Sequence, residues 1–279
     1  APISDILANE PGITVRTSGG LGTTTSVQMR GANTNQTILL VDGLRLNSAS
    51  TGAAPWAYLP MPQFSRMEIV RGPTSSSYGS DAIGGVIQLF TRRGEGDAKF
   101  YADAEYGTYT TSSETLGVEG SAGGLSYSVY GANTHSVSIP TYTNSYPNAS
   151  PGSYTNTSAS GNFIYTLMPG QEIGIKALYG AGSNGMFNDD STLDYSAWPT
   201  ITVNHNYQMA TQTESMNLIS LHSKNKIVDD WVSLVRVGST QDNSSTIYAA
   251  PQSWMPDRSK SFFNTTQKQA QWQNDFKLP

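Results

Sequence analysis

The densest group of possible metal ligands in the sequence is a carboxylate cluster in the polar stretch Asn188–Asp194. It contains Asp189, Asp190 and Asp194, next to serine and threonine hydroxyls. Oxygen ligands at this density suit Ca²⁺, although the spacing is not that of an EF-hand loop. We therefore expect a calcium site or a plain acidic loop here, and no covalently bound cofactor.

The remaining reactive side chains form no recognisable catalytic or nucleotide site. His135, His205 and His222 are too scattered for a zinc-binding pair or a Ser/His/Asp arrangement. The chain has no cysteine, which excludes disulfides and thiolate metal sites. No phosphate-binding loop motif is present, and no lysine precedes Lys99. A sequence pI of about 5.1 also argues against nucleic acid as a partner.

The elements that position these residues are indicated first by composition. Charged residues make up only 13% of the chain, yet the mean hydropathy is −0.36, so uncharged polar residues carry the polarity. This composition disfavours coiled coils and helical bundles, and 10% aromatic residues disfavour disorder. The longest clear apolar run, 38–41, is far too short for a membrane-spanning helix.

Charge and aromatic content change near residue 94. Residues 1–94 hold seven arginines and five acidic residues, a net charge of +2, whereas 95–279 carry a net charge of −7. Thirteen of the fifteen tyrosines also lie after residue 94. We therefore predict two domains, 1–94 and 95–279.

The first domain is predicted to be a small α+β unit. Asp42-Gly43 is a strong type I′ turn pair between a β-branched strand and its return strand. Short helices are expected at 5–9 and 62–66. The predicted strands are 26–31, 37–41, 44–46, 67–71 and 84–90.

The second domain alternates apolar and polar side chains in stretches of about ten residues. In 171–179, the odd positions Ile173, Ile175, Ala177 and Tyr179 form one face. Short turns alternate with long polar connections, as in outer-membrane barrels, although a soluble β-sandwich also alternates. The predicted strands are 98–108, 112–121, 124–134, 156–167, 171–181, 213–223, 230–240 and 265–276.

Four stretches of the first domain resemble the plug of TonB-dependent outer-membrane receptors. They are 27–31 (VQMRG), 38–47 (ILLVDGLRLN), 67–73 (MEIVRGP) and 77–87 (SYGSDAIGGVI). Their order and spacing follow the family over residues 1–93, and the end of the plug is most similar to the vitamin B12 (cobalamin) receptor branch.

This resemblance implies an α+β plug followed by antiparallel strands of a transmembrane, 22-stranded β-barrel in the bacterial outer membrane. It implies active transport of a scarce, large nutrient rather than enzymatic catalysis. The expected partners are TonB with its inner-membrane energising complex, outer-membrane lipid, and cobalamin or an iron chelate. A ferric siderophore or heme is the alternative cargo, and a monomer is expected.

The resemblance also implies roles for charged and small residues. Arg30, Glu68 and Arg71 would be enclosed by the barrel, where desolvated charges need partners. The candidate partners on the barrel are Glu105, Glu114, Glu119 and Glu172. Six glycines are expected to provide positive φ or close backbone approach: Gly31, Gly43, Gly72, Gly79, Gly84 and Gly85.

By the same resemblance, the stretch 47–58 is a plug apex that faces the ligand, and 74–76 is a second one. Small polar side chains there can bond the amide arms of a corrinoid, and an aromatic ring can cover an apolar face. The expected ligand contacts are Asn47, Ser50, Thr51, Trp56, Tyr58, Thr74 and Ser75.

Two other classes of protein were compared with this interpretation. One is a secreted glycan-binding β-protein, and the other is a polysaccharide-active enzyme. Neither explains the plug motifs.

About eight strands form a barrel too narrow for a plug of ~90 residues, so we expect the natural protein to continue for several hundred residues. No clear TonB-recruiting motif is present before the plug.

Overall fold

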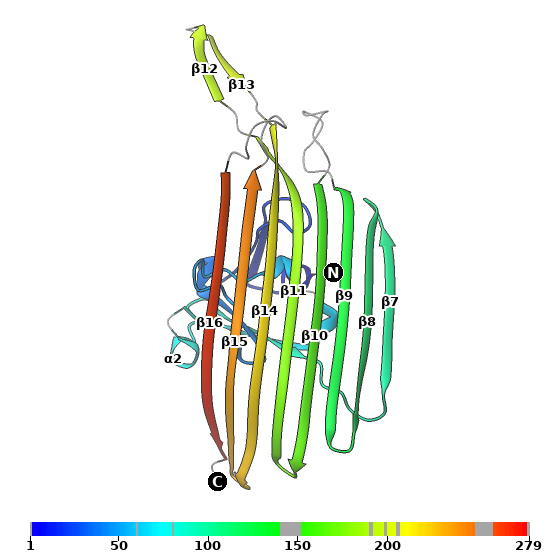
Figure 1. Ribbon diagram of the computed structural model, residues 1–279. Coiled ribbons are helices and arrows are strands. Elements are labelled where there is room, and N and C mark those ends of the chain that lie inside the picture. The colour runs from blue at the N-terminus through cyan, green and yellow to red at the C-terminus, as the bar shows by residue number, and fades with distance from the viewer. Residues whose placement is uncertain are drawn as a thin grey trace.

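The computed structural model describes residues 2–59, 61–79, 81–139, 152–189, 192–197, 200–204, 207–248 and 259–277. A small N-terminal domain of mixed elements (α1 to β6, residues 2–91) packs against one face of a tall antiparallel sheet, as Figure 1 shows. The segment 92–98 connects the two, and the predicted boundary at residue 94 lies within it. That boundary stays a prediction.

A buried parallel strand pair forms the centre of the N-terminal domain. Strand β3 consists of apolar and β-branched residues, and every one of its five residues is buried. It pairs in parallel with β6 and continues through the Asp42-Gly43 turn into β4. Asp42 and Gly43 have φ values of 48° and 85°, as a type I′ turn requires, so the predicted hairpin is confirmed.

The N-terminal domain contains two separate sheets. The larger has the order β4-β3-β6-β5, whereas β1 and β2 pair only with each other. The predicted helix at 62–66 is wrong, because a 3₁₀ turn ends at Gln63 and β5 begins at Phe64. The elements are α1 (Ile3–Leu7), β1 (Ile13–Thr17), β2 (Thr25–Met29), η1 (Thr34–Gln36), β3 (Thr37–Val41), β4 (Leu44–Arg45), η2 (Trp56–Tyr58), η3 (Met61–Gln63), β5 (Phe64–Arg71), α2 (Ser75–Tyr78) and β6 (Gly85–Thr91).

The second part of the chain forms an eight-stranded antiparallel meander in the order β16-β15-β14-β11-β10-β9-β8-β7. A hairpin of β12 and β13 projects from the connection between β11 and β14 (Figure 1). The strands are β7 (Lys99–Gly107), β8 (Thr111–Ala122), β9 (Leu125–Ile139), β10 (Gly152–Met168), β11 (Gln171–Asp189), β12 (Thr192–Ala197), β13 (Thr200–Asn204), β14 (Tyr207–Val228), β15 (Trp231–Tyr248) and β16 (Ser259–Phe276).

The two faces of the sheet differ in the way that the alternation predicts. The odd positions Ile173, Ile175 and Tyr179 of β11 are 45%, 40% and 43% exposed on the outer face. On β10, the even positions face the N-terminal domain and are buried, and they are largely polar. An apolar outer face and a polar inner face are typical of a barrel wall in lipid rather than a soluble sandwich.

Most strands are longer than the predicted ten residues, and β14 has 22. Its outer face carries the exposed side chains Leu221 and Ile219 near the short turns, but Asn217, Ser215 and Thr213 further up. The apolar alternation therefore ends while the backbone ladder continues. A strand of this length rises well above an apolar band of ~25 Å, so its upper half is suited to water.

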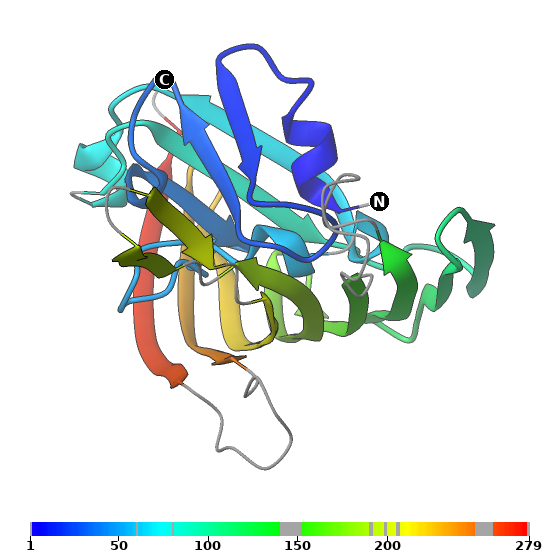
Figure 2. The ribbon, with the colours of Figure 1, turned by 90° about the horizontal axis from the view of Figure 1, so that it is seen from above.

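The N-terminal domain and the sheet share one hydrophobic core. Leu178, Met216 and Leu218 point inward from β11 and β14 and pack with Trp56 and Leu44. Figure 2, viewed from above, shows the N-terminal elements in the concave side of the curved sheet. None of the helices in the described ranges is long and apolar enough to cross a lipid bilayer.

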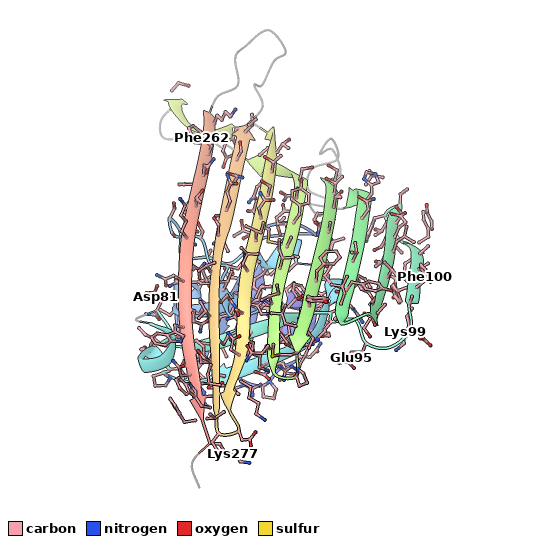
Figure 3. All side chains as sticks on the ribbon, turned by 60° about the horizontal axis from the view of Figure 1, so that its bottom comes forward. Asp81, Glu95, Lys99, Phe100, Phe262 and Lys277 are labelled. Atoms are coloured by element: carbon pink, nitrogen blue, oxygen red, sulfur yellow. The ribbon has the colours of Figure 1, made fainter. Side chains whose placement is uncertain are left out.

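The strand ends fix the vertical direction of the sheet. Phe262 marks the upper end of β16, where the long connections lie, and Lys277 follows its lower end (Figure 3). Glu95 and Lys99 lie on the chain leading from the N-terminal domain into the edge strand β7, which carries Phe100 (Figure 3). The connection therefore enters the sheet at the end with the short turns.

Candidate functional site between the N-terminal domain and the sheet

The centre of the interface is a buried ion pair that joins the two parts of the chain. The Asp42 side chain, only 2% exposed, accepts an ion-pair contact from Lys176 Nζ of β11 at 2.8 Å. Asp42 also accepts hydrogen bonds from the backbone N–H and the hydroxyl of Thr91, at 3.2 Å and 2.7 Å. A buried carboxylate with three donors is fully compensated, so this pair fixes the orientation of the β3–β4 turn against the wall.

Arg236 of β15 lies on the other side of the same turn. Gly43 has a φ of 85°, which favours glycine, and an added Cβ there would meet the guanidinium of Arg236. The guanidinium donates to Gln271 Oε1 of β16 at 2.6 Å. The turn is therefore held between two basic side chains from different strands.

Lower on the sheet, two consecutive arginines after β6 form a second set of contacts. Arg93 pairs with Glu172 of β11 through both nitrogens of its fork, at 2.9 Å and 3.4 Å. Arg92 lies 3.9 Å from Glu119 of β8, and its guanidinium stacks over the Tyr130 ring at 5.0 Å from the centroid. These contacts anchor the connection near the short turns.

Backbone groups of the connection are also bonded by the wall. Ser128 and Asn162 side chains donate to the carbonyl of Arg92 at 2.6 Å and 2.9 Å, and the Ser126 hydroxyl donates to that of Gly94 at 2.7 Å. Much of the interface is thus made by uncharged side chains that can exchange their partners for water.

The predicted pairing of Arg71 with acids of the sheet is wrong, and Glu68, expected among the enclosed charges, also finds its partner inside the N-terminal domain. Arg71 pairs with Glu10 at 2.8 Å, and Glu68 pairs with Arg66, all within the N-terminal domain. Arg66, Glu68 and Arg71 lie on β5, an edge strand of the four-stranded sheet of the N-terminal domain, and their partly exposed side chains find nearer partners there.

Two of the four predicted acidic partners do pair with arginines. Glu119 lies near Arg92, and Glu172 pairs with Arg93, both in the connection after β6. Arg30 contacts neither of them in the described part of the chain; it has φ of 51°, and its guanidinium lies beside Gly72.

The loop that follows β4 contains the first predicted ligand contacts. Ser50 is exposed, and its hydroxyl lies 2.6 Å from that of Thr265 on β16. Thr51 is exposed as well. Asn47 is fully buried instead, and its amide bonds the backbones of Leu39, Thr37 and Gly52. Asn47 therefore shapes the loop, which corrects its assignment as a ligand contact.

The two aromatic residues of this loop are also buried. Trp56 is 1% exposed and belongs to the shared core, and Tyr58 is 2% exposed. The Tyr58 hydroxyl donates to the carbonyl of Gly22 at 3.1 Å, and burial, with Glu214 nearby, raises its pKa well above the ordinary value. Neither ring is available to cover a ligand, because both are needed to fill the space between the loop and the wall.

The second predicted apex is not brought together with the first. Thr74 and Ser75 begin α2, which lies beside β16 well below the long connections (Figure 1). Ser75 is exposed, whereas the hydroxyl of Thr74 is buried. Of the seven predicted contacts, Ser50, Thr51 and Ser75 remain accessible.

Two glutamines on β16 bond the β4 edge of the four-stranded sheet. Gln269 accepts from the N–H of Arg45 at 2.9 Å and donates to its carbonyl at 2.8 Å. Gln267 donates to the carbonyl of Asn47. The amide of Gln269 thereby bonds the backbone N–H and C=O of the edge strand β4, which a neighbouring strand would otherwise pair with.

The predicted glycines have the backbone that their assignment requires. Gly84 has no positive φ, but a Cβ there would come within 2.9 Å of the Cβ of Ala32. Positive φ values occur at Gly31, Gly43, Gly72, Gly79 and Gly85.

The calcium prediction stays untested. Asp190 lies outside the described residues, and the structure describes only the backbone of Asp189 and Asp194, in β11 and β12. Among the described residues no group of three or more acidic or histidine side chains could hold a metal ion. Of the histidines, His135 is exposed, His205 is outside the described residues, and His222 faces inward across from Gly174.

Sequence reasoning missed Asp42, Lys176 and Arg236 as interface residues. Lys176 and Arg236 occupy even positions in strands whose odd positions are apolar, and that pattern places them on the inner face. Asp42 was interpreted only as a turn residue. The alternation thus indicated that Lys176 and Arg236 face inward, but the ion pair of Lys176 with Asp42 depends on how the turn packs against β11.

Comparisons with known proteins agree with this architecture. Residues 1–86 match the TonB-dependent Receptor Plug Domain. The chain is 42% identical over 103 residues to the vitamin B12 transporter BtuB of Vibrio vulnificus. The match covers 37% of this chain and 17% of that transporter.

Two solved structures share the fold. The siderophore receptor PiuA of Acinetobacter baumannii aligns with a TM-score of 0.63 at 15% identity, over 89% of this chain and 35% of that one. The ferripyoverdine receptor of the outer membrane of Pseudomonas aeruginosa aligns with a TM-score of 0.56 at 12% identity, over 97% and 46%. The chain thus spans less than half the length of these relatives. A plug packed against a sheet that resembles a receptor barrel wall is the shared architecture.

Proposed function

We propose that this chain, which carries a TonB-dependent receptor plug domain against a wall of barrel strands, serves TonB-dependent active transport across the bacterial outer membrane. The cargo we propose is cobalamin. The observation that carries this choice is the 42% identity to a vitamin B12 transporter, a far closer match than the fold-level likeness to siderophore receptors.

The interface suits a plug that must be retained and then moved. Retention relies on a few ion pairs, such as Asp42–Lys176, together with side-chain bonds to backbone groups. These bonds can be replaced by water one at a time, whereas a wholly apolar interface would expose its full area at once. In this proposal TonB, energised by the inner-membrane complex, supplies the work of moving the plug.

The loop at 48–53 is the proposed ligand-facing surface, because it lies on the side of the long connections and exposes small polar groups. Ser50 and Thr51 are the contacts we retain there. A Ser50→Ala variant should weaken cyanocobalamin binding by several-fold, the effect of about one hydrogen bond. Ser65→Ala is the matched control, since Ser65 is an exposed serine on β5.

The experiment that tests the function is growth rescue. A receptor-deletion strain that requires cobalamin would express the protein at its natural full length, with cyanocobalamin, a ferric siderophore or heme as the sole source. Rescue by cyanocobalamin that also requires TonB is the expected result. Rescue only by iron sources would replace the cargo and keep the transporter class, whereas no TonB-dependent rescue by any of them would refute both.

A further inference from the structure

A polar cavity of about 440 Å³ lies between the plug and the wall. One side is formed by the start of α1 and the β1–β2 turn, and the other by the inner faces of β7 to β10. Ala57 and Leu59, next to the ligand-facing loop, also line it. In Figure 2 these N-terminal elements lie beside the green strands of the wall. The volume is in the usual range of ligand sites and would hold part of a large cargo.

The chemistry of the cavity is selective. The wall side presents a row of hydroxyls from Thr111, Ser113, Thr115 and Thr134. Asn156, only 7% exposed, lines the same wall, and its Oδ1 is buried without a hydrogen-bond partner. The hydroxyls can donate to and accept from amides and hydroxyls of a solute, and the buried Asn156 carbonyl is an unsatisfied acceptor in the same wall.

The charges of the cavity have one sign. Asp5 of α1 and Glu105 of β7 lie on opposite sides, and no Lys, Arg or His of the described residues lines the cavity. Carboxylates without basic neighbours raise the local concentration of cations and lower that of anions. A polyanionic chelate would therefore be disfavoured here.

The inner side of the cavity is formed in part by a hairpin with a backbone ladder of its own. Strands β1 and β2 pair only with each other and share no ladder with the four-stranded plug sheet. The turn between them contains Gly19, Gly20 and Gly22, and the Tyr58 hydroxyl holds it through the Gly22 carbonyl. Displacement of this hairpin would leave the ladder of the sheet β4-β3-β6-β5 intact, and it would require Val27 and Met29 to leave the shared hydrophobic core.

We propose that this cavity is a transit site for the cargo between the plug and strands β7 to β10. It takes a neutral or cationic solute rich in amide or hydroxyl groups, and it widens by displacement of the β1–β2 hairpin. The inference rests on the proposed transport function and adds the location and the charge preference of the path.

Cysteine labelling tests the charge preference, because the chain has no cysteine of its own. Thr134→Cys places a thiol in the cavity, and Thr157→Cys, on the exposed outer face of β10, is the control. In the full-length receptor, a cationic methanethiosulfonate reagent should react faster than an anionic one at position 134, by about tenfold relative to the ratio at position 157. Equal ratios at the two positions would overturn the charge preference.

Cargo passage is tested in the same pair of positions. Cyanocobalamin should slow the labelling of Thr134→Cys during TonB-driven uptake and leave Thr157→Cys unchanged. Thr134→Trp should lower uptake by about tenfold, equivalent to ~1.4 kcal/mol in the barrier, with surface binding retained and Thr157→Trp normal. If uptake by Thr134→Trp is normal and labelling is not slowed, the transit site is refuted. Uptake by the wild-type receptor is scored separately, so that failure of the cobalamin function is distinguished from failure of the site.

Discussion

The Asp42–Lys176 ion pair gives the sharpest test of how the plug is retained. Lys176→Met removes the ammonium and keeps most of the side-chain volume. Asp42 then remains buried, at 3% exposed, with only the two hydrogen bonds from Thr91 and the neighbouring Arg236. Removing one partner of a buried pair costs roughly 3–5 kcal/mol.

The magnitude expected here is smaller than that range. Lys176 is 15% exposed, and Asp42 retains two hydrogen-bond donors and a nearby guanidinium, so we expect about 2–3 kcal/mol. This corresponds to an increase of roughly 30- to 150-fold in the population of plugs displaced from the wall. The double variant Asp42→Asn with Lys176→Met should recover more than half of the loss, since no buried charge is left unpaired.

The assay is protease cleavage and amide hydrogen exchange of the plug within the full-length receptor. Lys268→Met is the control, because Lys268 is exposed on the outer face of β16. Faster opening in Lys176→Met, partial recovery in the double variant and no change in Lys268→Met are expected. If Lys176→Met opens no faster than the control, or if the double variant opens faster than the single one, the pair does not retain the plug.

Three further predictions concern the plug. Gly43→Ala should lower the free energy of unfolding by up to about 1 kcal/mol more than Gly12→Ala, because both have positive φ but only the Cβ on Gly43 would displace the guanidinium of Arg236; chemical denaturation measures the difference. Trp56→Ala should cost ~3–5 kcal/mol through loss of the core, seen as a lower Tm, and a normal Tm would contradict its burial. Arg71→Ala should lower the free energy of unfolding by no more than ~1 kcal/mol and leave uptake unchanged, since the ion pair of Arg71 with Glu10 is partly exposed. A large loss of uptake would instead support the predicted role of Arg71 at the interface with the wall.

Much of the fold could be predicted from the sequence. The β3–β4 hairpin follows from an apolar β-branched run and the Asp42-Gly43 pair, and both signals are local. The wall strands follow from alternation, because one face is apolar and points outward and the other packs against the plug. The upper ends of β11 and β15 were missed because mostly polar residues follow one another there and the period-2 signal disappears, although the backbone ladder continues.

The site was predictable only in outline. Glu119 and Glu172 meet arginines of the N-terminal part, as the resemblance implied, but these are Arg92 and Arg93 in place of the expected Arg30 and Arg71. Which arginines they meet depends on where the connection enters the sheet, and that is not a local property. Trp56 and Asn47 were assigned to the ligand because an apex loop exposes some side chains, yet packing buries these two and leaves Ser50 accessible.

The sequence by itself determined the kind of protein: its motifs, its change of charge near residue 94 and its alternating strands depend on residue type and spacing along the chain. Only the tertiary structure decided which charges pair, as Asp42 with Lys176 and Arg71 with Glu10. The physical reason is range. Turns and alternation arise from neighbouring residues, whereas these ion pairs join residues 61 positions apart within the plug (Arg71 and Glu10) and more than a hundred positions apart between the plug and the wall (Lys176 and Asp42), so they are set only when the segments pack together.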